Sequence, residues 1–159
     1  MATRCNIFVK VRKEDIGKTF RIDLDKITGA ESIKQKNLDS NFGSVTIIYD
    51  YIGIYSHWDG YPDGGVGLTL YKHYNSYDLA LNLVLGGNVS TINGVYKPYV
   101  CLGNEDWVQE EPEQQDEMPE PEEDYLYLFD CGQWFFKSDL DADWTSLRWY
   151  FESAYKKES

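Results

Sequence analysis

Apolar and polar residues alternate along much of the first third of the chain, and this two-residue period predicts β-strands. The alternation is clear over residues 6–12 and 18–24. Residues 27–43 are polar and predict a loop, whereas residues 44–56 (SVTIIYDYIGIYS) are β-branched or aromatic nearly throughout. Such a run is typical of a central strand covered on both faces. Within it, Gly53 predicts a bulge or a bend.

The apolar spacing then changes to that of two helices. Val66, Leu70 and Tyr74 lie on one face of the first helix. Ser76 is suited to cap the N-terminus of the second helix, and Gly86-Gly87 is suited to end it. The second helix buries residues at the spacing i, i+3, i+4, i+7 and i+8: Tyr77, Ala80, Leu81, Val84 and Leu85.

The last third of the chain combines strands with one more helix. Residues 99–102 (YVCL) predict a short strand, and residues 125–138 predict a hairpin that turns near Cys131 and Gly132. A final helix is expected to begin among acids and end among bases, which complements the helix dipole. These residues are Asp139, Asp141, Asp143, Lys156 and Lys157.

The order of these elements predicts one α+β domain over residues 1–159. We expect an antiparallel or mixed sheet of about five strands, with about three helices packed mainly on one face. An acidic loop rich in proline and glutamate is expected at residues 105–124, because its prolines prevent a continuous helix.

The net charge of −12 is concentrated in that loop. Residues 105–124 contain eleven acids and no lysine or arginine, which leaves sixteen acids against fifteen bases elsewhere, a net charge of −1. No basic stripe is present, so direct binding to nucleic acid is disfavoured. The acidity therefore belongs to one segment of the chain.

Further features favour a cytoplasmic protein without a cofactor. No run approaches the roughly 18 apolar residues that cross a bilayer, and no signal-peptide pattern is visible at the start. The cysteines Cys5, Cys101 and Cys131 are odd in number and lack CxxC spacing, which favours reduced thiols. We therefore expect no membrane association, no bound metal and no cofactor.

The stretch IYSHWDGYPDGG, residues 54–65, allows a structural and a functional interpretation. Asp-Gly dipeptides and Pro62 are typical turn chemistry, so the stretch could simply end the central strand. The end of such a strand, before a helix, is also a common place for a pocket. The candidate binding residues of this turn are His57, Trp58, Asp59, Tyr61 and Asp63.

Two chemical alternatives follow from the same turn. Free amides at the start of the next helix could receive the phosphate of a nucleotide signal, with Trp58 stacking on the base. His57 and Asp59, two apart on an extended chain, would project to one side as an acid/base pair or half a metal site, giving a hydrolase or metal-dependent enzyme. A metal site lacks further ligands, and no serine or cysteine stands in a recognised catalytic motif. We therefore assign no catalytic residue and no metal ligand.

The acidic segment also has two interpretations. It could be a solvated loop that aids solubility. It could instead imitate a phosphate backbone and bind a basic groove on a nucleic-acid-binding protein, although a flexible loop would lose binding energy on ordering. The candidate binding residues are Glu110, Glu111, Glu113, Asp116, Glu117, Glu120, Glu122, Glu123 and Asp124.

Three stretches carry a resemblance to a protein family. ATRCNI at the start, IYSHWDGYPDG and GNEDWVQEEPE resemble small proteins encoded by bacteriophages, prophages and mobile elements. Members combine a TRCNI-like N-terminal strand with a strand that ends in YxHWDGYP, here Tyr55 to Pro62. The resemblance covers most of the chain apart from residues 13–43 and the acidic loop, and it implies an accessory protein in the cytoplasm of a bacterial host.

The sequence thus predicts a non-enzymatic interaction module of a mobile genetic element. Its sharpest form is an acidic inhibitor of a host defence protein of the nuclease or CRISPR type, contacted through a basic groove. The alternatives are the nucleotide-binding protein and the enzyme described above. The oligomeric state and the partner are left open.

Overall fold

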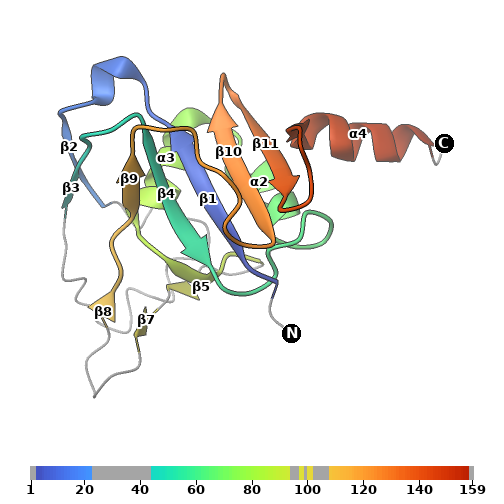
Figure 1. The fold of residues 1–159 in the computed structure, drawn as a ribbon, viewed down its shortest axis with the longest axis horizontal. Helices are drawn as coiled ribbons and strands as arrows, with labels where there is room; N and C mark the ends of the chain where they lie inside the picture. The colour runs from blue at the N-terminus through green and yellow to red at the C-terminus, as the bar shows by residue number, and fades with distance from the viewer. Residues whose placement is uncertain (1–2, 23–43, 94–96, 99, 102–107, 158–159) are drawn as a thin grey trace.

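The fold is described from a computed structural model that places residues 3–22, 44–93, 97–98, 100–101 and 108–157 (Figure 1). Three α-helices occur in these residues, and none of them is long and apolar enough to cross a membrane. They are α2 (Val66–His73), α3 (Tyr77–Leu85) and α4 (Leu147–Lys157).

A mixed sheet forms the centre of the fold, which confirms the predicted α+β class. Its strands are β1 (Cys5–Lys10), β4 (Tyr51–Ser56), β5 (Val89–Thr91), β6 (Lys97–Pro98), β9 (Glu113–Gln115), β10 (Tyr125–Asp130), β11 (Gln133–Ser138) and β12 (Thr145–Ser146). They follow the order β12-β11-β10-β1-β4-β5-β6, and β9 also pairs with β4. The pairs β1–β10 and β4–β5 are parallel, whereas β4 and β9 run antiparallel. Short strands at the edges raise the strand number above the expected five.

The apolar run 44–56 does not form one strand. β3 (Ser44–Thr46) pairs instead with β2 (Thr19–Arg21) in a separate two-stranded sheet, and only β4 enters the main sheet. Between them the chain bends, which leaves Ile48 and Tyr49 exposed. The prediction of a single strand over residues 44–56 was wrong, because residue types do not show where a chain changes from one strand partner to another. The predicted loop at 27–43 lies outside the described residues.

Gly53 does not mark a bulge, because its pairing with β1 is regular from Tyr51 to Ser56. It lies opposite Phe8, and a Cβ added to Gly53 would lie 2.5 Å from the Phe8 ring. The glycine therefore makes room for an aromatic ring that lies across the neighbouring strand.

The helices cover one face of the sheet, as predicted. In Figure 1, α3 lies behind β1 and β4, α2 lies on the β10–β11 side of the sheet, and α4 extends beyond β11. The alternate residues Cys5, Ile7 and Val9 of β1 belong to the core on this face, which also includes Leu70 of α2 and Leu83 of α3. Ser76 caps α3 as expected, since its hydroxyl accepts a hydrogen bond from the Leu79 amide (3.3 Å).

α4 begins later than predicted. Its first residue is Leu147, and the hydroxyl of Ser146 accepts a hydrogen bond from the Trp149 amide (3.3 Å). Asp141 instead accepts a hydrogen bond from the Ser138 amide (2.9 Å) and closes the turn after β11. Asp141 therefore stabilises a turn, and the short strand β12 separates the acids at 139–143 from the helix. The predicted strand at 99–102 is described only as β7 (Val100–Cys101), which pairs with β8 (Val108–Gln109).

The opposite face of the sheet is covered by the acidic segment, which we call the acidic strap and define as residues 110–124. Figure 1 shows the chain passing from β9 across the front of the sheet to β10. Beneath it lies a small core of Phe8, Tyr51, Leu126 and Leu128. The strap is thus part of the folded domain rather than a loop that leaves it. Glu105 and Asp106 lie outside the described residues.

Candidate functional site

The turn after β4 continues the parallel pairing with β5. The amide of His57 donates to the carbonyl of Val89 (3.2 Å), and the amide of Trp58 donates to Ser90 (2.8 Å). Asp59 then adopts a left-handed conformation with φ of 59°. This single residue redirects the chain away from the sheet, and aspartate is among the few non-glycine residues that tolerate it.

Three glycines make the turn compact. The Gly60 amide donates to the Thr3 carbonyl (2.8 Å), while the hydroxyl of Tyr127 donates to the Gly60 carbonyl (2.7 Å). A Cβ at Gly65 would lie 2.5 Å from the Asp59 carbonyl oxygen, and one at Gly67 would lie 2.6 Å from the backbone of Pro62. Backbone segments approach at these points more closely than any side chain permits.

The N-terminus of α2 has no free amides for a phosphate. The amides of Val66, Gly67 and Leu68 donate to the turn carbonyls of residues 59, 61 and 62 at 2.8, 3.4 and 2.8 Å. The first amides of a helix bind anions only when they lack a protein acceptor. The amides of these three residues are therefore occupied, which argues against the alternative in which they receive the phosphate of a nucleotide.

His57 and Asp59 have separate hydrogen-bond partners. Nδ1 of His57 lies 2.7 Å from the hydroxyl of Tyr55. The carboxylate of Asp59 accepts hydrogen bonds from the hydroxyl of Tyr61 (3.2 Å) and the amide of Asn93 (3.5 Å). The extended chain assumed for the acid/base pair is wrong, because Asp59 is left-handed. Among the described residues, no group of three His, Cys, Asp or Glu side chains is placed to hold a metal ion.

The acidic strap is fastened to the domain along its length. At its start, the Asn88 side-chain amide donates to the Glu110 carboxylate (2.6 Å), and at its end the Arg4 backbone amide donates to the Asp124 carboxylate (3.0 Å). In the middle, Gln114 accepts from the Ile48 amide (2.8 Å) and donates to a carbonyl of β3 (3.0 Å). Pro119 is buried against the sheet.

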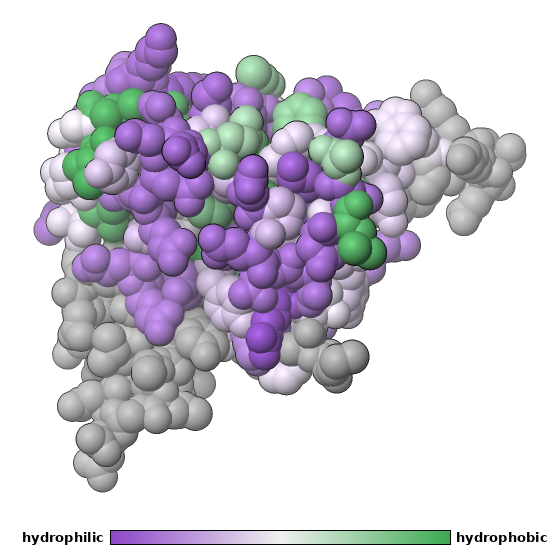
Figure 2. Space-filling model, viewed as in Figure 1, coloured by the Kyte–Doolittle hydropathy of each residue, from purple (hydrophilic) through white to green (hydrophobic). Residues whose placement is uncertain are grey.

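This attachment directs the charges outward. Seven of the nine acidic side chains in the strap are exposed, and Glu110 and Glu123 are half-buried. The ion pair found in the described part of the chain joins Lys18 to Asp15 (3.3 Å), and none there involves a strap carboxylate. Figure 2 shows a largely hydrophilic surface over this face. The exposed carboxylates of the strap therefore lie on a chain that is hydrogen-bonded to the domain, and no cation among the described residues forms an ion pair with them.

The turn after β4 and the end of the strap both contact Thr3 and Arg4, the two residues before β1. Gly60 donates to Thr3, Asp124 accepts from Arg4, and the Tyr125 amide donates to the Arg4 carbonyl (3.2 Å). Gly60 and Asp124, which are more than sixty residues apart in sequence, are thus bound by the neighbouring residues Thr3 and Arg4. Trp58 and Tyr61 are exposed on the turn, with 48% and 37% of their surface accessible. The predicted binding residues of the turn and of the strap end consequently lie in one region of the molecule.

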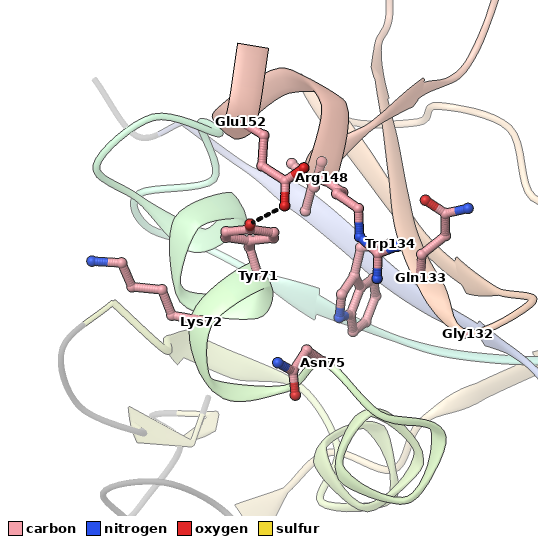
Figure 3. Close-up of a pocket in the computed structure, with 9 residues that line it drawn as sticks. Tyr71, Lys72, Asn75, Gly132, Gln133, Trp134, Arg148 and Glu152 are labelled. Atoms are coloured by element: carbon pink, nitrogen blue, oxygen red, sulfur yellow. Dashed lines mark hydrogen bonds between the residues drawn. The ribbon is translucent and has the colours of Figure 1, made fainter. Parts of the chain in front are cut away.

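A hollow that the sequence did not predict lies between α2, the β10–β11 turn and α4 (Figure 3). It has a volume of about 600 Å³ and is lined by Tyr71, Lys72, Asn75, Gly132, Gln133, Trp134, Leu147, Arg148 and Glu152. Tyr71 donates to Glu152 (3.3 Å), Arg148 extends toward Trp134, and Lys72 points away from the centre. These residues come from three separate elements without a shared motif, so no local pattern could have revealed the hollow.

Comparisons with protein-family models, with curated proteins and with solved structures found no match to this chain. The assignment of a function consequently depends on the geometry of the turn and the strap.

Proposed function

We propose that the protein is a non-enzymatic interaction module that binds a basic protein through its acidic strap. The proposal depends on one observation. A segment with nine acids in fifteen residues pairs with β4 through β9 and is hydrogen-bonded to Asn88 at its start, Ile48 in its middle and Arg4 at its end. A segment that folds on binding gives up about 2–5 kcal/mol to ordering. A strap that is ordered beforehand avoids much of this cost, which removes the main objection to a charged recognition surface.

The charge distribution supports a basic groove as the docking site on the partner. Grooves that bind nucleic acid present lysine and arginine to phosphates, and exposed carboxylates on a fixed support offer similar charges. Complementary charge raises association rates by about 10–10³-fold at low salt. The resemblance to phage and mobile-element proteins implies a bacterial host as the setting, and a defence nuclease as partner is part of this proposal.

The test is an affinity capture from bacterial lysate, analysed by mass spectrometry at low and moderate salt. The strap variant carries Glu117→Gln, Glu120→Gln and Glu122→Gln, which are exposed positions. A matched variant removes the same charge elsewhere through Glu14→Gln, Asp78→Asn and Asp139→Asn.

We expect the native and matched proteins to retain a stoichiometric partner at low salt. The strap variant should lose it, and moderate salt should weaken it in all cases, because exposed charges are screened over about 10 Å at 0.1 M. A partner that stays bound to the strap variant would refute the proposal.

A further inference from the structure

We propose that the exposed corner of the turn receives an arginine side chain of the partner. The corner consists of Trp58, Asp59 and Tyr61, and this inference rests on the proposed function, because it identifies a residue type in the same partner. The two groups that such a side chain needs, an aromatic face and a carboxylate, are adjacent in sequence. Each is held in place by its own set of contacts.

The indole of Trp58 is supported from behind. The two rings of His57 and Trp58 pack in a T-shaped arrangement, with centroids 4.7 Å apart and an interplanar angle of 89°. The imidazole is held in turn by its 2.7 Å contact with the hydroxyl of Tyr55. With 48% of its surface accessible, the indole offers area to a partner without needing to be rearranged first.

The carboxylate of Asp59 is oriented by neutral donors. Tyr61 donates to one oxygen (3.2 Å) and Asn93 to the other (3.5 Å), so both oxygens are fixed while each keeps room for another donor. Within the described chain, no lysine, arginine or histidine lies within ion-pair distance of this carboxylate. The corner therefore presents an oriented negative charge at the Tyr61 hydroxyl, one residue after the exposed indole of Trp58.

Arginine fits this arrangement better than lysine. Its planar guanidinium can donate two parallel hydrogen bonds to a carboxylate and can stack on an aromatic face, whereas an ammonium is a compact, strongly hydrated charge. The end of the strap lies nearby, since Thr3 contacts Gly60 and Arg4 contacts Asp124. A basic partner drawn to the strap would thus bring its arginines to the corner.

The experiment uses acetylated peptides of six arginines and of six lysines as probes. Their affinities for the full chain are measured by calorimetry and by tryptophan fluorescence at one low salt concentration. The variants are Trp58→Ala and Asp59→Asn. Asparagine tolerates the left-handed conformation at residue 59, so this change keeps the backbone while it removes the charge and one of the two accepted hydrogen bonds. Trp149→Ala and Asp139→Asn are the matched controls at exposed positions.

We expect the native protein to prefer the arginine peptide by about threefold or more, the size of an exposed cation–π contact. Both corner variants should reduce this preference below about twofold, and both controls should keep it. Equal affinity of the native protein for the two peptides, or a preference that both corner variants retain, overturns the inference.

The strap variant separates this inference from the proposed function. It should weaken both peptides and leave the arginine preference intact. If it weakens neither peptide while the corner variants abolish the preference, the strap proposal fails and the corner remains an arginine site.

Discussion

The two faces of the sheet are covered in different ways. Behind the sheet, residues of all three helices join the strands in a large continuous core. In front of it, four buried residues and the half-buried Trp144 form a small core beneath an extended chain. The helices satisfy their own backbone hydrogen bonds, whereas the strap depends on β4, on Gln114 and on contacts at its two ends.

The two faces therefore contribute differently: the helix face contributes most of the stability, and the strap face contributes the exposed charges. Hydrophobic stabilisation scales with the apolar area removed from water, so most of it comes from the helix face. The strap buries little apolar surface and instead fixes a set of carboxylates. Changes behind the sheet should therefore affect folding, and changes in front should affect the charged surface.

The largest expected effect is on the helix face. Leu83 of α3 is fully buried in the large core, so Leu83→Ala should lower the free energy of unfolding by about 2–5 kcal/mol. The comparison variant on the strap face is Pro119→Ala, which removes a buried residue of the strap. Urea denaturation measures both. An equal loss for the two variants would contradict the division between the faces.

Next in size is the contact between Gly53 and Phe8. Because a Cβ at residue 53 would lie 2.5 Å from the Phe8 ring, Gly53→Ala should destabilise the fold by about 1–3 kcal/mol through overpacking. The double variant Gly53→Ala with Phe8→Leu should recover part of this loss, because it removes the ring. Thermal unfolding of the three proteins would show whether the ring is the cause. No recovery in the double variant would argue against it.

The sequence predicted the helix face well because its signals are local. The spacing of Tyr77, Ala80 and Leu81, with Ser76 before them, specifies a helix and its buried side without knowledge of the rest of the fold. The hairpin turn at Cys131 and Gly132 is local in the same sense, and both residues have positive φ.

The strap face was poorly predicted because its order depends on partners distant in sequence. Gln114 is held by residues 46 and 48, and Asp124 by Arg4. Composition alone describes such a segment as a solvated loop. Asp-Gly dipeptides and Pro62 indicated a turn after the central strand. The left-handed conformation of Asp59, which gives His57 and Asp59 separate partners, depends on backbone contacts with residues distant in sequence.

A smaller loss of stability is expected when the hydrogen bond between β10 and the turn after β4 is removed. Burial raises the pKa of the Tyr127 hydroxyl well above its usual value, and this hydroxyl donates to Gly60 (2.7 Å). Tyr127→Phe should lower stability by about 1–2 kcal/mol at neutral pH by leaving that carbonyl unpaired.

The same group should contribute to alkaline unfolding. A pKa raised in the folded state means that the unfolded chain loses this proton first, near pH 10. The contribution is thus complete below about pH 10 and is lost as the pH rises toward the folded pKa. Denaturation between pH 7 and 11 should show a shallower decline for Tyr127→Phe, with exposed Tyr49→Phe as the control. An unchanged slope would exclude Tyr127 from the alkaline transition.

The smallest effect on stability should be the most informative about the strap. Gln114→Ala removes the side chain that joins the strap to residues 46 and 48, yet it keeps every carboxylate. Because Gln114 is only half-buried and Ile48 is exposed, global stability should change little, but hydrogen exchange at the Ile48 amide should accelerate. Gln115→Ala is the control, since its amide donates within the strap to the Glu117 carbonyl (2.9 Å).

Gln114→Ala distinguishes the effect of the fixed arrangement of the strap carboxylates from the effect of their total charge. If the fixed arrangement of the carboxylates matters, Gln114→Ala should weaken partner binding while the salt dependence stays the same, because the number of charges is unchanged. If only the total charge matters, binding should match that of the native protein although the strap is loosened. Unchanged binding would mean that the acidic segment only aids solubility and attracts basic proteins nonspecifically.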